Sequence, residues 1–163
     1  MSTHDAQGVE MALLIRDRTE DPLVAGLALD IVLTQQAQIG RMSGWLDVWG
    51  LPATGDDPPM AWMGHAVEGR MPGMASPEEI AHLKELSGVE ADREFLRLMI
   101  RHHEGGAPMA QALLERSDDE AVRRLARSIV QSQQAEVEVM RRMLTSKETT
   151  PPAVSPQVAT PSP

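Results

Sequence analysis

Histidine and methionine side chains recur at three- and four-residue steps between residues 99 and 109. The positions are Met99, His102, His103 and Met109, with Gly106 between them. On an α-helix these steps put side chains on one face, which would form a stripe of imidazole and thioether donors. Imidazoles suit several transition metals and thioethers select Cu(I), so in a chain without cysteine the stripe indicates a copper ion as the ligand. His103 lies about 100° around the helix from His102, so only one of the two can point straight at the bundle axis.

The same pattern occurs near the start of the chain. Residues 1–46 align with residues 99–144 without a gap, and about 17 of 46 positions agree, which indicates an internal duplication. The matched pairs with chemical interest are Met1 and Met99, His4 and His102, Gly8 and Gly106, Met11 and Met109, Gln35 and Gln133, Gln36 and Gln134, and Met42 and Met140. Asp5 takes the place of the second histidine, so the first copy offers a carboxylate that is neither soft nor neutral.

A second set of soft donors lies between the two copies. Its members are Met60, Met63, His65, Met71 and Met74. Methionine and histidine together suit copper in both oxidation states, so this set is a second candidate for the ligands. The alternative is a hydrophobic plug in which Trp62 and these methionines close one end of the bundle.

Polar side chains accompany the histidine stripe. In an antiparallel hairpin that turns near residues 117 and 118, His102 lies level with Gln133, and the first copy places His4 level with Gln35. A buried imidazole needs a partner, so we expect each glutamine to hydrogen-bond its histidine, with or without a metal. Two carboxylates, Glu104 and Glu136, are within reach as further donors, although they also suit the solvated face of a helix.

Helix signals surround these donors. The first helix should run to about Arg18, and Asp21 with Pro22 should begin a second helix that ends near Trp49. A capping box at 76–79 begins a short helix closed by Gly88, and a second capping box at 117–120 begins a helix that reaches about Leu144. The expected parts are a first hairpin at 1–49, a connector at 50–90, a second hairpin at 91–146 and a disordered tail at 147–163. The predicted fold is an all-α four-helix bundle built from two helical hairpins with a short lid helix in the connector.

Composition excludes several functions. With a net charge of -9, the chain should not have nucleic acid or an anionic membrane surface as its main partner, while cations remain suitable. The absence of cysteine removes thiolate catalysis and iron–sulfur clusters. A ferritin-type diiron oxidase needs Glu-x-x-His on two helices, and Glu79 with His82 gives the only such spacing. We therefore expect no enzymatic activity.

The sequence shows neither a secretory signal nor a run of about 18 apolar residues. The second copy is preceded by a helical lead-in at 91–98 whose counterpart would lie before Met1, so we expect the natural chain to begin further upstream.

The segment MIRHHEGGAPMA, with IVQSQQAEVEVM after it and MPGM before it, resembles the bacterial domain of unknown function 305 family over most of residues 1–146. The resemblance implies a duplicated helical hairpin of ferritin-like architecture in an exported or membrane-anchored protein. It also implies copper binding, with His102, His103, Met99 and Met109 as ligands in the second copy and His4 and Met11 in the first. Asp5 departs from the paired histidines of the family.

Two hypotheses follow from the sequence. In the first, an extracytoplasmic protein without enzymatic activity binds a copper ion through histidine and methionine, for buffering or transfer in the cell envelope. In the second, a structural or interaction bundle uses the same side chains only for packing. A homodimer is compatible with both hypotheses, and neither identifies a protein partner.

Overall fold

The computed structural model describes residues 1–55, 57–64 and 66–149. In these ranges the chain is helical and has no β-strand, which confirms the all-α prediction. The elements are α1 (Ser2–Arg16), α2 (Pro22–Trp49), the 3₁₀ helix η1 (Ala61–Met63), α3 (Pro77–Glu85), α4 (Gly88–Arg116) and α5 (Glu120–Thr149). The predicted lead-in at 91–98 forms the first turns of α4.

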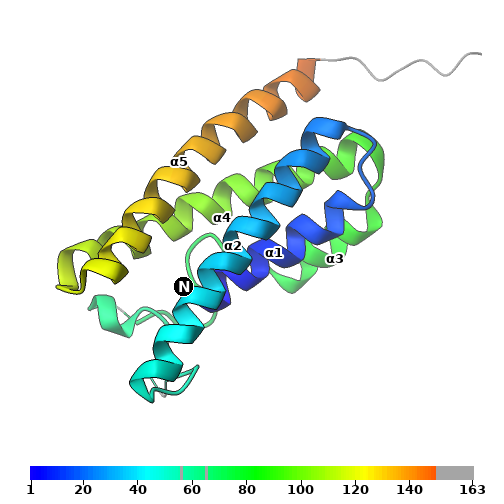
Figure 1. Cartoon of the computed structure of the whole chain (residues 1–163). Coiled ribbons are helices and arrows are strands. Elements are labelled where there is room, and N and C mark those ends of the chain that lie inside the picture. The colour runs from blue at the N-terminus through cyan, green and yellow to red at the C-terminus, as the bar shows by residue number, and fades with distance from the viewer. Residues whose placement is uncertain (56, 65, 150–163) are drawn as a thin grey trace, which may run out of the picture.

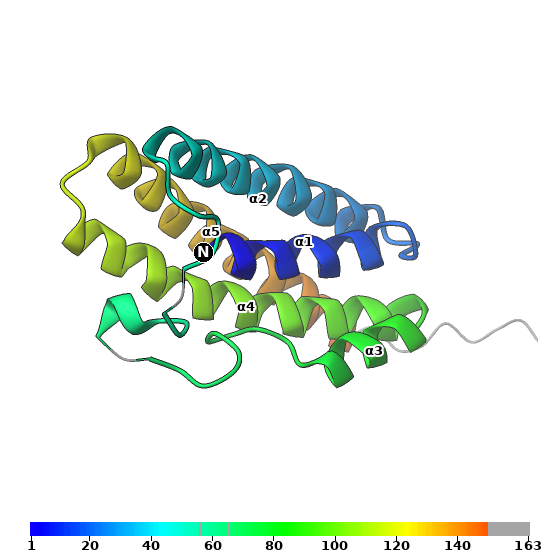
Figure 2. The ribbon, with the colours of Figure 1, turned by 90° about the horizontal axis from the view of Figure 1, so that it is seen from below.

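Two helical hairpins form the bundle (Figure 1). α1 packs along α2, α4 packs along α5, and the two hairpins meet where α1 crosses onto α4. The short helix α3 packs on both α4 and α1, and the connector that leads to it runs along α4 (Figure 2). The two inner helices are therefore α1 and α4. Each carries one copy of the repeated histidine motif, near the start of α1 and in the middle of α4.

Equivalent aspartates begin the second helix of each hairpin. Asp21 accepts a hydrogen bond from the Leu23 backbone nitrogen at 2.8 Å, and Asp119 accepts one from Ala121 at 2.8 Å. The predicted capping box at 117–120 was therefore wrong in its cap residue, because Ser117 only accepts a bond from the Asp119 nitrogen. A cap two residues later still satisfies backbone donors that the first helical turn leaves free.

The short helix α3 begins as predicted and ends earlier than predicted. Ser76 and Glu79 form a reciprocal capping box, and Glu79 also accepts two hydrogen bonds from Arg101 on α4 at 2.6 and 2.7 Å. The helix ends at Glu85, whereas Gly88, which was expected to close it, lies at the start of α4 with a φ of 55°. The paired Glu79 and Arg101 fix this lid helix to the helix that carries the paired histidines.

Apolar side chains fill the bundle on both sides of the histidine layer. The larger cluster includes Met11, Ile31, Phe95, Met99 and Met140, and a smaller one at the other end is built on Ala110, Leu125 and Ile129. Because these clusters remove large apolar side chains from water, they supply the main driving force for folding.

One buried ion-pair network closes the far end of the bundle. The Lys147 ammonium donates to Asp21 at 2.6 Å and to Asp92 at 2.8 Å, which joins the end of α5 to the starts of α2 and α4. α5 continues beyond the predicted end at Leu144 to Thr149, so the first three residues of the predicted disordered tail are helical. The rest of the predicted disordered tail, residues 150–163, lies outside the described residues.

The helix α2 is long and apolar enough to cross a membrane by length and composition alone. The same properties suit the core helix of a bundle, and here α2 packs along α1.

Candidate metal centre

A layer of buried polar side chains lies between the two apolar clusters. Its members come from four helices and are each at most 3% exposed: His4 and Asp5 on α1, Gln35 on α2, His102 and His103 on α4, and Gln133 on α5. The sequence predicted that the repeated histidines and glutamines would fall in one layer, and the structure brings both copies to the centre of one bundle. Both histidines of the pair are buried, and His103 lies on the flank that faces α5.

Each imidazole in this layer is held through its Nε2 atom. His4 Nε2 donates to the Pro72 carbonyl oxygen at 3.1 Å, His102 Nε2 donates to the His4 carbonyl oxygen at 2.9 Å, and His103 Nε2 donates to Glu136 at 2.6 Å. Because a carbonyl oxygen can only accept, Nε2 carries a proton in the first two rings, and in a neutral ring Nδ1 then carries a lone pair. All three Nδ1 atoms are buried without a hydrogen-bond partner.

This arrangement is the one found around metal-binding histidines. A ligating imidazole usually donates its second ring N–H to a carboxylate or a backbone carbonyl, which fixes its tautomer and its orientation. The Pro72 carbonyl, the His4 carbonyl and the Glu136 carboxylate play these parts here. The residues thus fit a metal ion with respect to donor type and to the orientation of the protonated nitrogen.

The rings of His4 and His102 lie face to face at the crossing of α1 and α4. Their centroids are 3.8 Å apart and the ring planes are tilted by 30°. Burial, with smaller contributions from His4 and His103 nearby, lowers the pKa of His102 to about 2. His102 is therefore neutral at physiological pH, so it does not have to lose a proton before it can bind a metal.

Among the described residues no three side chains of His, Cys, Asp or Glu are grouped closely enough to hold an ion together. His4 Nδ1 is 3.9 Å from Asp5 Oδ1, and both carboxylate oxygens of Asp5 lack hydrogen-bond partners.

The glutamines do not hydrogen-bond the histidines as predicted. Instead they pack on the repeated glycines, one turn after each histidine: a Cβ added at Gly8 would lie 3.0 Å from Gln35 Cδ, and one at Gly106 would lie 3.0 Å from Gln133 Oε1. The amide groups of Gln35 and Gln133 have no hydrogen-bond partner in the described structure. The prediction was wrong because backbone carbonyl oxygens accept the hydrogen bonds from the Nε2 atoms of His4 and His102. The glutamine amides lie instead against Gly8 and Gly106, where the absence of a side chain leaves room for them.

The carboxylates behave differently from one another. Glu136, at 20% side-chain exposure, is the partner of His103, whereas Glu104 is at the surface, in an ion pair with Arg141. In the alignment of the two copies, His103 and Glu136 correspond to Asp5 and Gln38, both of which are also buried. Glu136 was expected within reach of the histidine stripe, and the structure pairs it with His103; the exchange of acidic and neutral side chains between the copies was a further signal for this contact.

The methionines divide into two groups. Met11, Met99 and Met109 are at most 2% exposed and lie on the same helix stripes as the histidines. In the connector, the structure buries Met60 and leaves Met63, Met71 and Met74 half-buried, while His65 lies outside the described residues. Trp62 is 49% exposed, so it does not form the buried plug that was considered for this segment.

Solved structures similar to this chain include two DUF305 proteins and copper-bound forms of CopM. A DUF305 protein of Streptomyces coelicolor, inferred to be secreted, is 45% identical, with a TM-score of 0.87 over 91% of this chain and 89% of that chain. A DUF305 fragment of Deinococcus radiodurans is 38% identical, with a TM-score of 0.76 over 90% and 91% of the two chains. CopM in its Cu(II)-bound form is 25% identical, with a TM-score of 0.73 over 90% and 91% of the two chains.

A comparison with curated proteins gives no match. Residues 1–144 match the domain of unknown function DUF305, which covers both hairpins and the connector. The chain belongs to the DUF305 family.

Proposed function

We propose that this protein binds a copper ion in the buried layer at the crossing of α1 and α4. One observation carries the proposal: three imidazoles are each held through Nε2 by an acceptor, and each presents an unpartnered Nδ1 in a water-poor interior. Imidazole nitrogen suits both Cu(I) and Cu(II), and the thioethers on the same stripes suit Cu(I). The copper-bound forms of CopM support the choice of metal at the level of a distant relative.

The proposed ligands are His102 and His103 from the second copy and His4 from the first, with Asp5, Met99, Met109 and Met11 as the neighbouring donors. Gln35 and Gln133 line the layer, and Glu136 orients His103. The connector methionines Met60, Met63, Met71 and Met74, with His65, form a separate candidate set. We infer a role in copper buffering or transfer without enzymatic chemistry, and an extracytoplasmic location, which the secretion inferred for the Streptomyces relative supports.

Metal titration of the purified chain tests the site. Cu(I) and Cu(II) are titrated against a competing chelator with the wild type and with a His102→Ala/His103→Ala double variant. His82→Ala, an exposed histidine on α3, is the matched control. We expect high affinity in the wild type and the control, and loss of that affinity in the double variant. An affinity that the double variant retains would refute the assignment of these ligands.

Thermal unfolding separates binding from packing. A ligand that binds only the folded state stabilises it by about 2.7 kcal/mol at one hundred times its Kd. For a domain of this size, that corresponds to an increase in Tm of about 5–10 °C. The alternative, a bundle in which imidazoles and thioethers only pack, predicts a Tm that does not change with copper and no metal in protein purified from its native host.

A further inference from the structure

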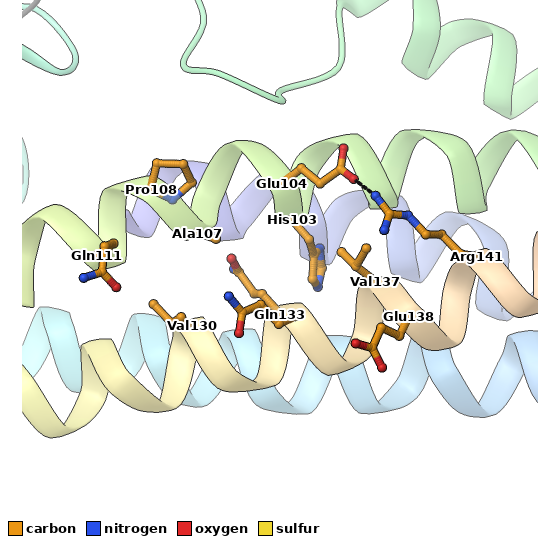
Figure 3. A pocket seen from close by; sticks show the side chains of 11 residues that line it. His103, Glu104, Ala107, Pro108, Gln111, Val130, Gln133, Val137, Glu138 and Arg141 are labelled. Carbon is orange, nitrogen blue, oxygen red and sulfur yellow. Dashed lines mark hydrogen bonds and ion pairs between the residues drawn. The ribbon is translucent and has the colours of Figure 1, made fainter.

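A pocket of about 620 Å³ lies between α4 and α5 and opens to solvent (Figure 3). Its wall includes two residues of the buried layer, His103 and Gln133, together with Ala107 and Gln134. Arg141 and Glu104 form an ion pair across its rim, from α5 to α4. The pocket therefore joins the solvent to a side chain of the histidine cluster.

The two layer residues carry unused polar atoms at this wall. His103 is 1% exposed and Gln133 is 2% exposed, yet His103 Nδ1 and both polar atoms of the Gln133 amide lack hydrogen-bond partners. A buried polar group without a partner is unfavourable, because no hydrogen bond offsets the loss of its contacts with water. A hydrated metal ion that enters through the pocket could satisfy these atoms, since the imidazole nitrogen can bind the metal and the amide can hydrogen-bond its water molecules.

The pocket wall at His103 and Gln133 lies close to the paired rings of His4 and His102. The rings of His103 and His102 have centroids 6.0 Å apart. A Cβ added at Gly106 would lie 3.0 Å from Gln133 Oε1 and 3.0 Å from His4 Cε1. Gln133 and His4 thus approach the same glycine from two sides, so movement of the unpaired Gln133 amide would connect the pocket to His4.

The connector closes another side of the cluster. The backbone of Pro72 and Gly73 lies directly on Gly105, where a Cβ would come within 2.6 Å of the Gly73 nitrogen.

Between α2 and α5 there is another pocket, of about 500 Å³, which reaches Glu136 but has no imidazole in its lining. Among the pockets described, the one between α4 and α5 is thus the direct approach to a ligand nitrogen.

The charge at the rim suits a cation. Glu138 lines the pocket and has no ion-pair partner among the described residues, while the charge of Arg141 is offset by Glu104. The chain as a whole carries a net charge of -9. The unpaired carboxylate at the rim and the net negative charge of the chain both attract cations, which increases their rate of association.

We propose that the pocket between α4 and α5 is the access port through which a copper ion reaches and leaves the buried imidazoles, with His103 and Gln133 as the groups that it meets first. This inference rests on the proposed copper-binding function. It concerns the route of the ion, so it predicts an effect on rates that equilibrium binding does not show.

Two matched variants, in each of which an alanine is replaced by tryptophan, test the route. Ala107→Trp places an indole in the port, and Ala135→Trp places one in the α2/α5 pocket on the other flank of α5. Gln134→Trp fills the port from the opposite helix and guards against a local effect of the first variant. Capture of Cu(I) from its bicinchoninate complex, and its release to excess bicinchoninate, are followed by stopped-flow absorbance.

Blocking a route slows capture and release by the same factor. We expect both port variants to slow each rate about tenfold with an unchanged Kd, and Ala135→Trp to keep the wild-type rates. Wild-type rates in both port variants would overturn the proposal, as would slowing by Ala135→Trp alone or a port variant that changes only release. If the wild type takes no Cu(I) from the chelator, the proposed function itself fails, which is a distinct outcome.

Discussion

The contact between the connector and α4 gives the sharpest test of how the histidine layer is held. Gly105 lies under the backbone of Pro72 and Gly73, and the Pro72 carbonyl is the hydrogen-bond acceptor of His4 Nε2. In Gly105→Ala, the new Cβ would lie 2.6 Å from the Gly73 nitrogen and closer still to the Pro72 carbonyl group. Both neighbours are backbone, so no side chain can rotate to make room, and the connector has to move away from α4.

Two opposite effects set the magnitude. Replacing glycine by alanine inside a helix stabilises it by about 1 kcal/mol. Against this, inserting a group into a tightly packed site costs about 1–3 kcal/mol, and a hydrogen bond lost by a buried donor such as His4 Nε2 costs about 1–3 kcal/mol more. We therefore expect Gly105→Ala to lower the free energy of unfolding by about 1–5 kcal/mol, since the two unfavourable contributions together exceed the gain.

Gly40→Ala on α2 is the matched control. It has the same change of residue inside a helix, and a Cβ there would have nothing within 4 Å. We expect it to raise the free energy of unfolding by about 0.5–1 kcal/mol. Urea unfolding gives both values, and NMR of the imidazole nitrogens shows whether His4 loses its bond to Pro72. A Gly105→Ala protein as stable as the Gly40→Ala protein would refute the close contact.

Three further predictions concern charge and caps. The pKa of His102 in the folded chain is below its ordinary 6.5, so the unfolded state binds the proton first as the pH falls. The free energy of unfolding should therefore be highest above about pH 6.5 and decrease below it, by at most about 1.4 kcal/mol per pH unit from this residue. Urea unfolding between pH 8 and pH 5 measures the slope. Lys147→Ala should cost about 2 kcal/mol because it leaves the buried Asp92 carboxylate without its cation, and an unchanged Tm would contradict the network. Asp119→Ala should lower the free energy of unfolding by about 1 kcal/mol and Ser117→Ala by clearly less, since the aspartate caps α5. Equal decreases in Tm for the two variants would instead support Ser117 as the cap.

Much of the fold could be predicted because local signals and the duplication agree. Asp21 with Pro22 at the start of α2, and the reciprocal bonds of Ser76 and Glu79 at the start of α3, depend only on nearby residues. The cap of α5 was placed two residues early, although Asp119 aligns with Asp21 in the two copies and has the same role. The internal alignment was the better guide there, because both capping patterns are chemically sound.

The membership of the buried layer could be predicted, but its hydrogen bonds could not. Level positions in a hairpin do not show that the Pro72 carbonyl, from a connector without regular structure, reaches His4. Nor do they show that the His4 carbonyl accepts the bond from His102, because that contact depends on how α1 crosses α4. Spacing along one helix predicts which side chains share a face, whereas the partners of those side chains come from other elements.

The position of the histidine layer connects the duplication to the proposed function. The copies meet where α1 crosses α4, so a residue repeated at that crossing faces its own counterpart, as His4 faces His102. In a fully symmetric pair each ring would donate to the other backbone, but Pro72 takes the bond of His4, and Asp5 stands where the other copy has His103. The layer is thus left with more unpartnered acceptor atoms than donor atoms: the Asp5 carboxylate oxygens, the amide oxygens of Gln35 and Gln133 and the Nδ1 atom of neutral His102 outnumber the two amide nitrogens. An excess of buried acceptors is unfavourable for the empty bundle and favourable for a cation, so a bound cation should stabilise the contact between the hairpins as well as each ligand.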